Sequence, residues 1–189
     1  MRIIAGKLKG FSLNMPKNKN TRPLKDRIRE SIFNLLTHSK KNFLQLEQSN
    51  VLDLYSGVGS FGLECISREA GKVCFIEKRK DVVQILEKNI EKLKVKNKIK
   101  IFLNDIFKLI NKKNIFESKF DLIFCDPPFE DRNIEKLIEL IFDEKLFSKN
   151  GIIILHRNKV VKEKLPNCIK IIEERTYGIS KIIFGKFLS

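Results

Sequence analysis

Two short stretches of the chain combine residue types that could bind and transform a small molecule. The first runs from Val51 to Gly62 and is an apolar segment that contains a carboxylate, Asp53, and ends in a glycine-rich turn. The second, later in the chain, is Asp126-Pro127-Pro128-Phe129. A carboxylate, two rigid prolines and an aromatic ring supply hydrogen-bond acceptors and a stacking face. The two stretches together predict a site that binds a ligand and carries out chemistry on it.

The glycine-rich turn by itself fits two classes of cofactor. Gly57, Gly59 and Gly62 have the spacing of a dinucleotide-binding turn, and Glu77 lies twenty residues after Gly57, where a ribose-binding acid is expected. Asp53 favours the second class, a cofactor that carries a cationic sulfonium or a free amino group. A carboxylate beside the turn attracts such a group but repels the pyrophosphate of a dinucleotide. We therefore predict S-adenosylmethionine (SAM) as the cofactor, and a nicotinamide-dependent oxidoreductase is the weakest alternative.

The predicted cofactor contacts come from the turn and from acids at the ends of successive strands, where open α/β sheets bind ligands. Glu77 could accept hydrogen bonds from both ribose hydroxyls, and Asp105 could accept one from an adenine amino group. Each of these acids could instead be an ordinary surface carboxylate. The expected set is Asp53, Tyr55, Ser56, Gly57, Gly59, Glu77 and Asp105.

The second stretch fits chemistry on an exocyclic amino group. Consecutive prolines lack N–H donors and fix φ, so the chain leaves the sheet in a rigid turn with its carbonyls directed outward. The amino group of a flipped-out base needs acceptors for its N–H bonds and a ring to stack against. We expect Asp126, Pro127, Pro128 and Phe129 to be the catalytic residues. A plain strand exit with a core phenylalanine is the alternative.

The elements around these stretches indicate an α/β fold. Buried parallel strands are expected at 51–55, 72–77, 100–103, 120–125 and 151–156, because each segment is nearly continuously apolar. Helical periodicity falls between them at 59–68, 80–94, 106–111 and 133–142. Two more strands, 169–172 and 182–188, are joined around Tyr177-Gly178 and suggest an antiparallel hairpin. We predict a mostly parallel seven-stranded sheet with an antiparallel C-terminal edge.

Residues 1–48 form a basic N-terminal extension, and residues 49–189 the α/β domain. The chain carries 38 basic and 23 acidic side chains, a net charge of +15, of which +8 lies in the extension. Such a field favours polyanionic partners, although part of the lysine excess could be compositional bias. A strand pair is expected within 2–13 and a helix at 22–37, with Thr21 as N-cap and Pro23 in the first turn. The predicted RNA contacts are Arg2, Lys7, Arg22, Arg27 and Arg29, and an internal ion pair is the alternative for Arg27 or Arg29.

Several other classes of protein are not supported by the sequence. No apolar run approaches the length of a membrane span, and the N-terminus lacks a secretory signal, so we expect a cytoplasmic protein without a membrane partner. The cysteines are widely separated singles, Cys65, Cys74, Cys125 and Cys168, and only two histidines accompany them. Neither a disulfide scaffold nor a metal site is predicted.

The motifs resemble those of SAM-dependent amino-methyltransferases with the [DN]PP[YFW] signature. More narrowly, the chain resembles the RsmD family in RIIAGK at 2–7, TRP at 21–23, DRIRE at 26–30, FN at 33–34 and YG at 177–178. This resemblance implies a Rossmann-like class I methyltransferase that modifies the N2 of a guanine in 16S ribosomal RNA. A DNA adenine-N6 methyltransferase and a non-catalytic RNA-binding ribosome-assembly factor are the alternatives.

The resemblance also sets expectations for partners and exposes one departure. A monomer is expected, acting on 16S ribosomal RNA within a small-subunit assembly particle that completes the recognition surface. The strand ending Leu155-His156-Arg157 has His156 where many relatives are expected to have an acid. A lone histidine at a strand end is more often structural than catalytic, so no site role is assigned to it.

Overall fold

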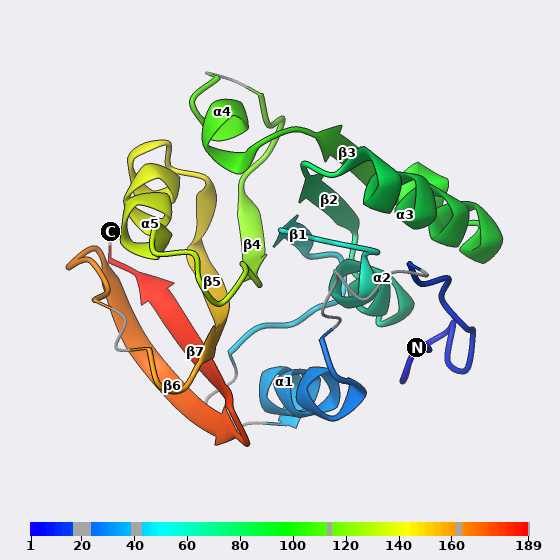
Figure 1. Ribbon diagram of the computed structural model, residues 1–189, viewed down its shortest axis with the longest axis horizontal. Helices are drawn as coiled ribbons and strands as arrows, with labels where there is room; N and C mark the ends of the chain where they lie inside the picture. Colours follow the sequence, from blue (N-terminus) through cyan, green and yellow to red (C-terminus); the bar gives the residue numbers. More distant parts are fainter. Residues whose placement is uncertain (17–23, 39–42, 113–114, 162–163, 189) are drawn as a thin grey trace.

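Seven strands of the described residues form one mixed sheet with helices on both faces (Figure 1). The computed structural model describes residues 1–16, 24–38, 43–112, 115–161 and 164–188. The strands are β1 (Asn50–Leu54), β2 (Lys72–Glu77), β3 (Ile99–Leu103), β4 (Phe120–Cys125), β5 (Phe147–Asn158), β6 (Ile169–Tyr177) and β7 (Ser180–Phe187). Their order is β3-β2-β1-β4-β5-β7-β6, with β1 to β5 parallel and β7 antiparallel to both β5 and β6. The predicted parallel sheet and antiparallel edge are confirmed.

The helices divide between the two faces of the sheet because successive strand residues point to opposite sides. The helices are α1 (Asp26–His38), α2 (Ser60–Ser67), α3 (Lys80–Leu93), α4 (Ile106–Ile110) and α5 (Ile134–Asp143), and a short 3-10 turn, Lys96–Lys98, precedes β3. Within β1, Val51 packs on the side of α1, α2 and α3, and Leu52 on the side of α4 and α5. Asp53 therefore faces the α2 side, which places its carboxylate against the start of that helix.

The C-terminal strands are longer than the sequence predicted. β5 begins at Phe147 instead of Gly151, and β6 runs to Tyr177 instead of ending at Ile172. β6 is the outermost strand, charged side chains follow one another at Glu173, Glu174 and Arg175, and most of its residues are exposed or half-buried. An edge strand keeps its backbone pairing on one side while its charged side chains remain in water. A prediction that relies on continuous apolar runs therefore ends β6 too early, at Ile172.

The N-terminal extension differs from its predicted form. Instead of a strand pair, residues 2–13 form one antiparallel bridge, between Arg2 and Ser12, closed by turns in which Gly6 and Gly10 have positive φ. The helix is described from Asp26 onward, and its expected N-cap and first turn, Thr21 to Pro23, lie outside the described residues. The buried apolar residues of the extension belong to the same hydrophobic cluster as those on one face of the sheet.

Stacked aromatic rings fix α1 against the domain. The rings of Phe33 in α1 and Phe61 in α2 have centroids 5.1 Å apart, and the centroids of Phe61 and Phe124 in β4 are 3.8 Å apart. This column of rings runs from the extension to β4. The loop that follows β4, residues 126–133, is called the Asp126 loop below. Burial of large aromatic side chains gives such contacts much of their stabilising effect. Of the described helices, none is long and apolar enough to cross a membrane.

Candidate active site

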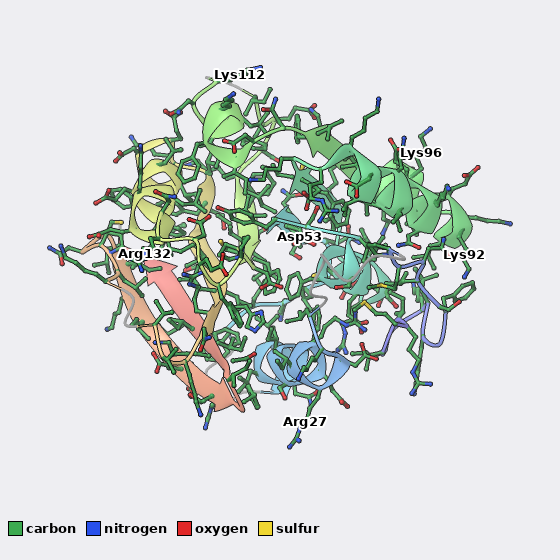
Figure 2. All side chains as sticks on the ribbon, viewed as in Figure 1. Arg27, Asp53, Lys92, Lys96, Lys112 and Arg132 are labelled. Carbon is green, nitrogen blue, oxygen red and sulfur yellow. The ribbon has the colours of Figure 1, made fainter. Side chains whose placement is uncertain are left out.

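The carboxyl ends of the parallel strands meet at one edge of the sheet and line a cavity of about 660 Å³. Every predicted catalytic residue and all the predicted cofactor contacts except Gly59 line it, and so does His156. The residues come from the ends of β1, β2, β3, β4 and β5, as expected for an open α/β sheet. Asp53 lies near the centre of the molecule in this view, whereas the labelled basic residues lie at its periphery (Figure 2).

Asp53 holds the turn after β1 against α2. Its carboxylate accepts a 2.9 Å hydrogen bond from the backbone N–H of Gly62, and only 1% of the residue is exposed. Burial raises the pKa of Asp53 well above its ordinary value, the Gly62 hydrogen bond opposes that rise, and the nearby charges of Asp126 and Glu77 add to it. A cation in the cavity would stabilise the ionised form of this carboxylate.

The glycines of the turn are required by backbone geometry and packing. Gly57 and Gly59 have φ values of 55° and 81°, in the left-handed region that favours glycine. A Cβ on Gly59 would lie 2.3 Å from a methyl of Leu86 in α3, whereas one on Gly57 would have no atom of the described residues within 4 Å. At Gly59 the glycine therefore makes room for the helix that covers the sheet.

The other two predicted cofactor acids also serve the backbone around the cavity. Glu77 accepts the N–H of Gly57 at 2.9 Å with one carboxylate oxygen and that of Arg79 at 3.0 Å with the other. Asp105 is the N-cap of α4 and accepts from Phe107 at 3.0 Å. A carboxylate has about four acceptor positions. Both acids can therefore hold the loops in place and still accept hydrogen bonds from a ligand.

Ser56 provides a test of whether a polar ligand fits this cavity. Its Oγ is buried and has no hydrogen-bond partner among the described residues, although the residue lines the cavity. A buried polar atom without a partner is costly, and such atoms are rare in folded proteins. A ligand carrying polar groups would satisfy this hydroxyl, and SAM carries a carboxylate, an amino group, ribose hydroxyls and an adenine amino group. The donor and acceptor set around the cavity therefore fits SAM.

The Asp126 loop is held from behind by the end of β5. His156 Nδ1 lies 2.7 Å from Asp126 Oδ1, and the His156 ring meets the Phe129 ring edge to face at 5.4 Å. Arg157, fully buried, donates to the carbonyl of Pro128 at 3.1 Å and to that of Asp131 at 2.6 Å. The loop that carries the predicted catalytic residues is thereby fixed at several points.

Tyr55 links the cofactor side of the cavity to the same loop. Its hydroxyl donates to Asp131 Oδ2 at 3.0 Å, and burial raises the pKa of Tyr55, so the phenol stays protonated. The Pro128 carbonyl also accepts from the N–H of Asp131 at 2.9 Å. Because the Pro128 carbonyl already has two donors, the Pro127 carbonyl is the better candidate for a substrate acceptor.

Sequence reasoning missed the roles of His156 and Arg157. Neither residue belongs to a motif, so the sequence predicts no role for Arg157 and only a structural one for His156. A signal was present in the sequence, since two polar residues follow the apolar run 152–155 in a central strand. Polar groups buried in a sheet interior must find partners, and the neighbouring strand ends in the Asp126 loop.

The predicted RNA contacts have three different outcomes. Arg2 and Arg27 are exposed, and Figure 2 shows Arg27 projecting outward from α1. Lys7 is also exposed and forms a 2.6 Å ion pair with Glu69. Arg22 lies outside the described residues. Arg29 is a correction to the prediction, because it is fully buried and cannot reach a phosphate.

Arg29 instead joins the extension to α2. Its guanidinium lies 3.0 Å from Asp26 and 3.8 Å from the fully buried Glu64, and it also contacts the carbonyl of Arg2. Burial lowers the pKa of Arg29, and the charges of Glu64 and Asp26 oppose that shift. The internal ion pair considered for Arg27 or Arg29 is thus formed by Arg29.

Comparisons with known proteins agree with the geometry of the cavity. Residues 1–186 match the family model described as conserved hypothetical protein 95. Ribosomal RNA small subunit methyltransferase D of Haemophilus influenzae is 32% identical over 179 residues, which cover 95% of this chain and 90% of that protein. The protein of the same name from Buchnera aphidicola is 34% identical over 157 residues, covering 83% of this chain and 78% of its own.

A solved structure shows the same architecture. "Putative methyltransferase yhhF" from Escherichia coli aligns with a TM-score of 0.85 and 25% identity, covering 100% of this chain and 98% of its own. The β3-β2-β1-β4-β5-β7-β6 order and the antiparallel β7 are thus those of a Rossmann-like methyltransferase fold.

Proposed function

Because the chain belongs to the conserved hypothetical protein 95 family, the RsmD family of methyltransferases, we propose that it transfers a methyl group from SAM to the exocyclic N2 of a guanine in 16S ribosomal RNA. The observation that carries this proposal is that one cavity is lined both by groups that fit a cofactor and by groups that fit an acceptor base. Asp53, Glu77 and Asp105 line it from three strand ends, and the Asp126 loop lines it from a fourth. A cofactor side and an acceptor side therefore share one space.

The cofactor side would hold SAM through the residues already described. Asp53 would attract its positive charge, Glu77 its ribose hydroxyls and Asp105 its adenine amino group, while Ser56 would gain the partner that it lacks. When bound, SAM supplies an activated methyl group on a sulfonium that leaves as a neutral thioether. The protein therefore needs to supply position more than chemical activation.

The acceptor side would bind the target base. Asp126, whose side chain is 20% exposed, and the Pro127 carbonyl would accept the amino hydrogens, and the half-buried Phe129 ring would stack on the base. These acceptors direct the nitrogen lone pair toward the methyl group. The new nitrogen–carbon bond forms as the sulfur–carbon bond breaks with its electron pair retained by sulfur. The surplus proton on nitrogen then leaves to Asp126 or to water.

The exposed cations of the extension would bind phosphates around the target nucleotide. Arg2, Lys7 and Arg27 keep this role in the proposal, and Arg29 does not. Phosphate contacts position a nucleic acid without reading its sequence. Recognition of one guanine therefore requires further surface, and a protein-bearing small-subunit particle would supply it. Within that particle we propose that the enzyme acts as a monomer.

The test offers several acceptors in parallel. Purified protein and methyl-labelled SAM are mixed with unmodified small ribosomal subunits, deproteinised ribosomal RNA or duplex DNA, and incorporated label is counted. We expect label in the small subunits, less in deproteinised ribosomal RNA and none in DNA. Label in DNA alone would overturn the RNA substrate, and SAM binding without transfer to any acceptor would favour the non-catalytic assembly factor.

A further inference from the structure

The imidazole of His156 lies behind the carboxylate that is proposed to bind the target amino group. His156 Nδ1 is 2.7 Å from Asp126 Oδ1, and 4% of the residue is exposed. The ring also packs edge to face against Phe129, the proposed stacking residue, with centroids 5.4 Å apart. One side chain at the end of β5 thus contacts two of the three groups that would hold the base. Only the Asp126 contact is a hydrogen bond.

The hydrogen-bond pattern assigns one tautomer to His156. An ionised carboxylate can only accept, so the proton of a neutral imidazole must lie on Nδ1. His156 Nε2 is buried and has no hydrogen-bond partner among the described residues. A proton on Nε2 would therefore be a buried donor without an acceptor, which is unfavourable. Both nitrogens indicate a neutral ring that donates from Nδ1 to Asp126.

The Nδ1–H of His156 lies among several carboxylates that line the cavity. Asp126 shares its cavity with Asp53 and Glu77. The charges of Asp126 and Glu77 contribute to the raised pKa of Asp53. A donor aimed at Asp126 Oδ1 stabilises the carboxylate and directs Oδ2 away from the ring. An Asp126 carboxylate held in this orientation can accept a hydrogen from an amino group in the cavity, whereas one rotated away cannot.

We propose that His156 is a positioning residue of the methyl-transfer site: its Nδ1–H holds the Asp126 carboxylate oriented toward the amino group of the base. This inference rests on the proposed function, because it names how the same site is kept ready for its substrate. His156 need not touch the base. Its effect would be on the rate of transfer and not on the binding of SAM.

The first test is spectroscopic and does not require an active enzyme. The chain contains only two histidines, so nitrogen–proton correlation spectra of the full-length protein and of His38→Leu assign the ring signals of His156. The expected pattern is protonation at Nδ1 in the wild type, with its loss in Asp126→Ala. Protonation at Nε2, or an Nδ1–H signal unchanged in Asp126→Ala, would overturn the proposal.

The second test uses a conservative pair of variants. In His156→Asn the amide nitrogen occupies roughly the place of Nδ1 and can still donate, whereas His156→Leu has no donor. We expect His156→Leu to lower kcat by roughly 10- to 100-fold, as misplacement of a reacting group does, with KM for the particle and Kd for SAM unchanged. His156→Asn should recover most of the lost kcat.

The outcomes of the two tests separate the inference from the proposed function. Equal loss of kcat in both variants, or none in His156→Leu, would overturn the positioning role while leaving the methyltransferase intact. If the wild type transfers no methyl group to any ribosomal acceptor, the proposed function fails and with it the positioning role. A spectrum with Nδ1 protonated would then show only that the hydrogen bond between the two side chains exists.

Discussion

Arg29 and Glu64 are both fully buried, and Arg29 Nε lies 3.8 Å from Glu64 Oε2. Glu64 also accepts the backbone N–H groups of Ile4 at 2.7 Å and Ala5 at 2.9 Å. One carboxylate in the middle of α2 thereby binds two separate parts of the N-terminal extension. The extension is attached to the domain through this buried charge, in addition to apolar packing.

Replacing Glu64 should therefore destabilise the whole chain. Glu64→Gln leaves the Arg29 guanidinium buried with only the half-exposed Asp26 as its charged partner, and loss of one member of a buried pair costs about 3 to 5 kcal/mol. Urea denaturation of the purified protein measures the change in the free energy of unfolding. Lys7→Ala, which removes the exposed Lys7–Glu69 pair, is the control and should cause no measurable change. A Glu64→Gln protein as stable as that control would contradict the buried-pair account.

Arg29 also shows where sequence reasoning stops. Helical spacing places Arg22, Lys25 and Arg29 on one side of a helix, and a basic face next to apolar residues predicts a solvated surface. Only the packing of α1 on α2 shows that part of this face is covered. A clue was present in Glu64, an acid inside the apolar run Phe61 to Ile66, because a charge buried there requires a partner.

The parallel sheet was predictable because its buried strands are continuous apolar runs, and these lie where β1, β2 and β4 were expected. The Asp126–His156 contact was not, since 30 residues separate its partners and β5 must lie next to β4 to form it. Pairing of neighbouring strands in a sheet is tertiary information that no local pattern contains.

Asp126 offers the most direct test of the acceptor side. Asp126→Ala removes the carboxylate, and we expect methyl transfer to fall by about 10² to 10⁴-fold, the usual contribution of such a group, while Kd for SAM changes little. Asp126→Asn keeps an oxygen acceptor and belongs to the same signature, so its loss should be smaller. Rates under saturating SAM, with calorimetric SAM binding alongside, measure both effects. Wild-type turnover in Asp126→Ala would remove this residue from the site.

The raised pKa of Asp53 predicts a pH-dependent affinity for SAM. The ionised carboxylate attracts the cationic cofactor and the protonated one does not, so binding should weaken as pH falls through the raised pKa of Asp53 in the free protein. Asp53→Asn should bind SAM more weakly and with a flatter pH dependence. Calorimetric titrations of both proteins across pH measure this. Parallel pH curves for the two proteins would exclude Asp53 as the responsible group.

The exposed cations of the extension predict a salt-dependent RNA affinity. Each phosphate contact contributes about one unit to the slope of log affinity against log salt concentration, so Arg2→Gln and Arg27→Gln should each reduce the slope by about one. Lys170→Gln, an exposed cation on β6, is the control and should leave the slope unchanged. Filter binding to ribosomal RNA over a range of salt gives the slopes. Equal slopes for all three variants would show that the cations of the extension do not contribute specifically to RNA binding.

The methylated nucleoside itself defines the proposed reaction, so its identity is the decisive measurement. Unmodified small ribosomal subunits are incubated with SAM and either the wild-type protein or Asp126→Ala, and the digested RNA is analysed by mass spectrometry against nucleoside standards. The account predicts N2-methylguanosine with the wild type and little or none with the variant. Any other methylated nucleoside, or equal amounts of N2-methylguanosine from both proteins, would contradict it.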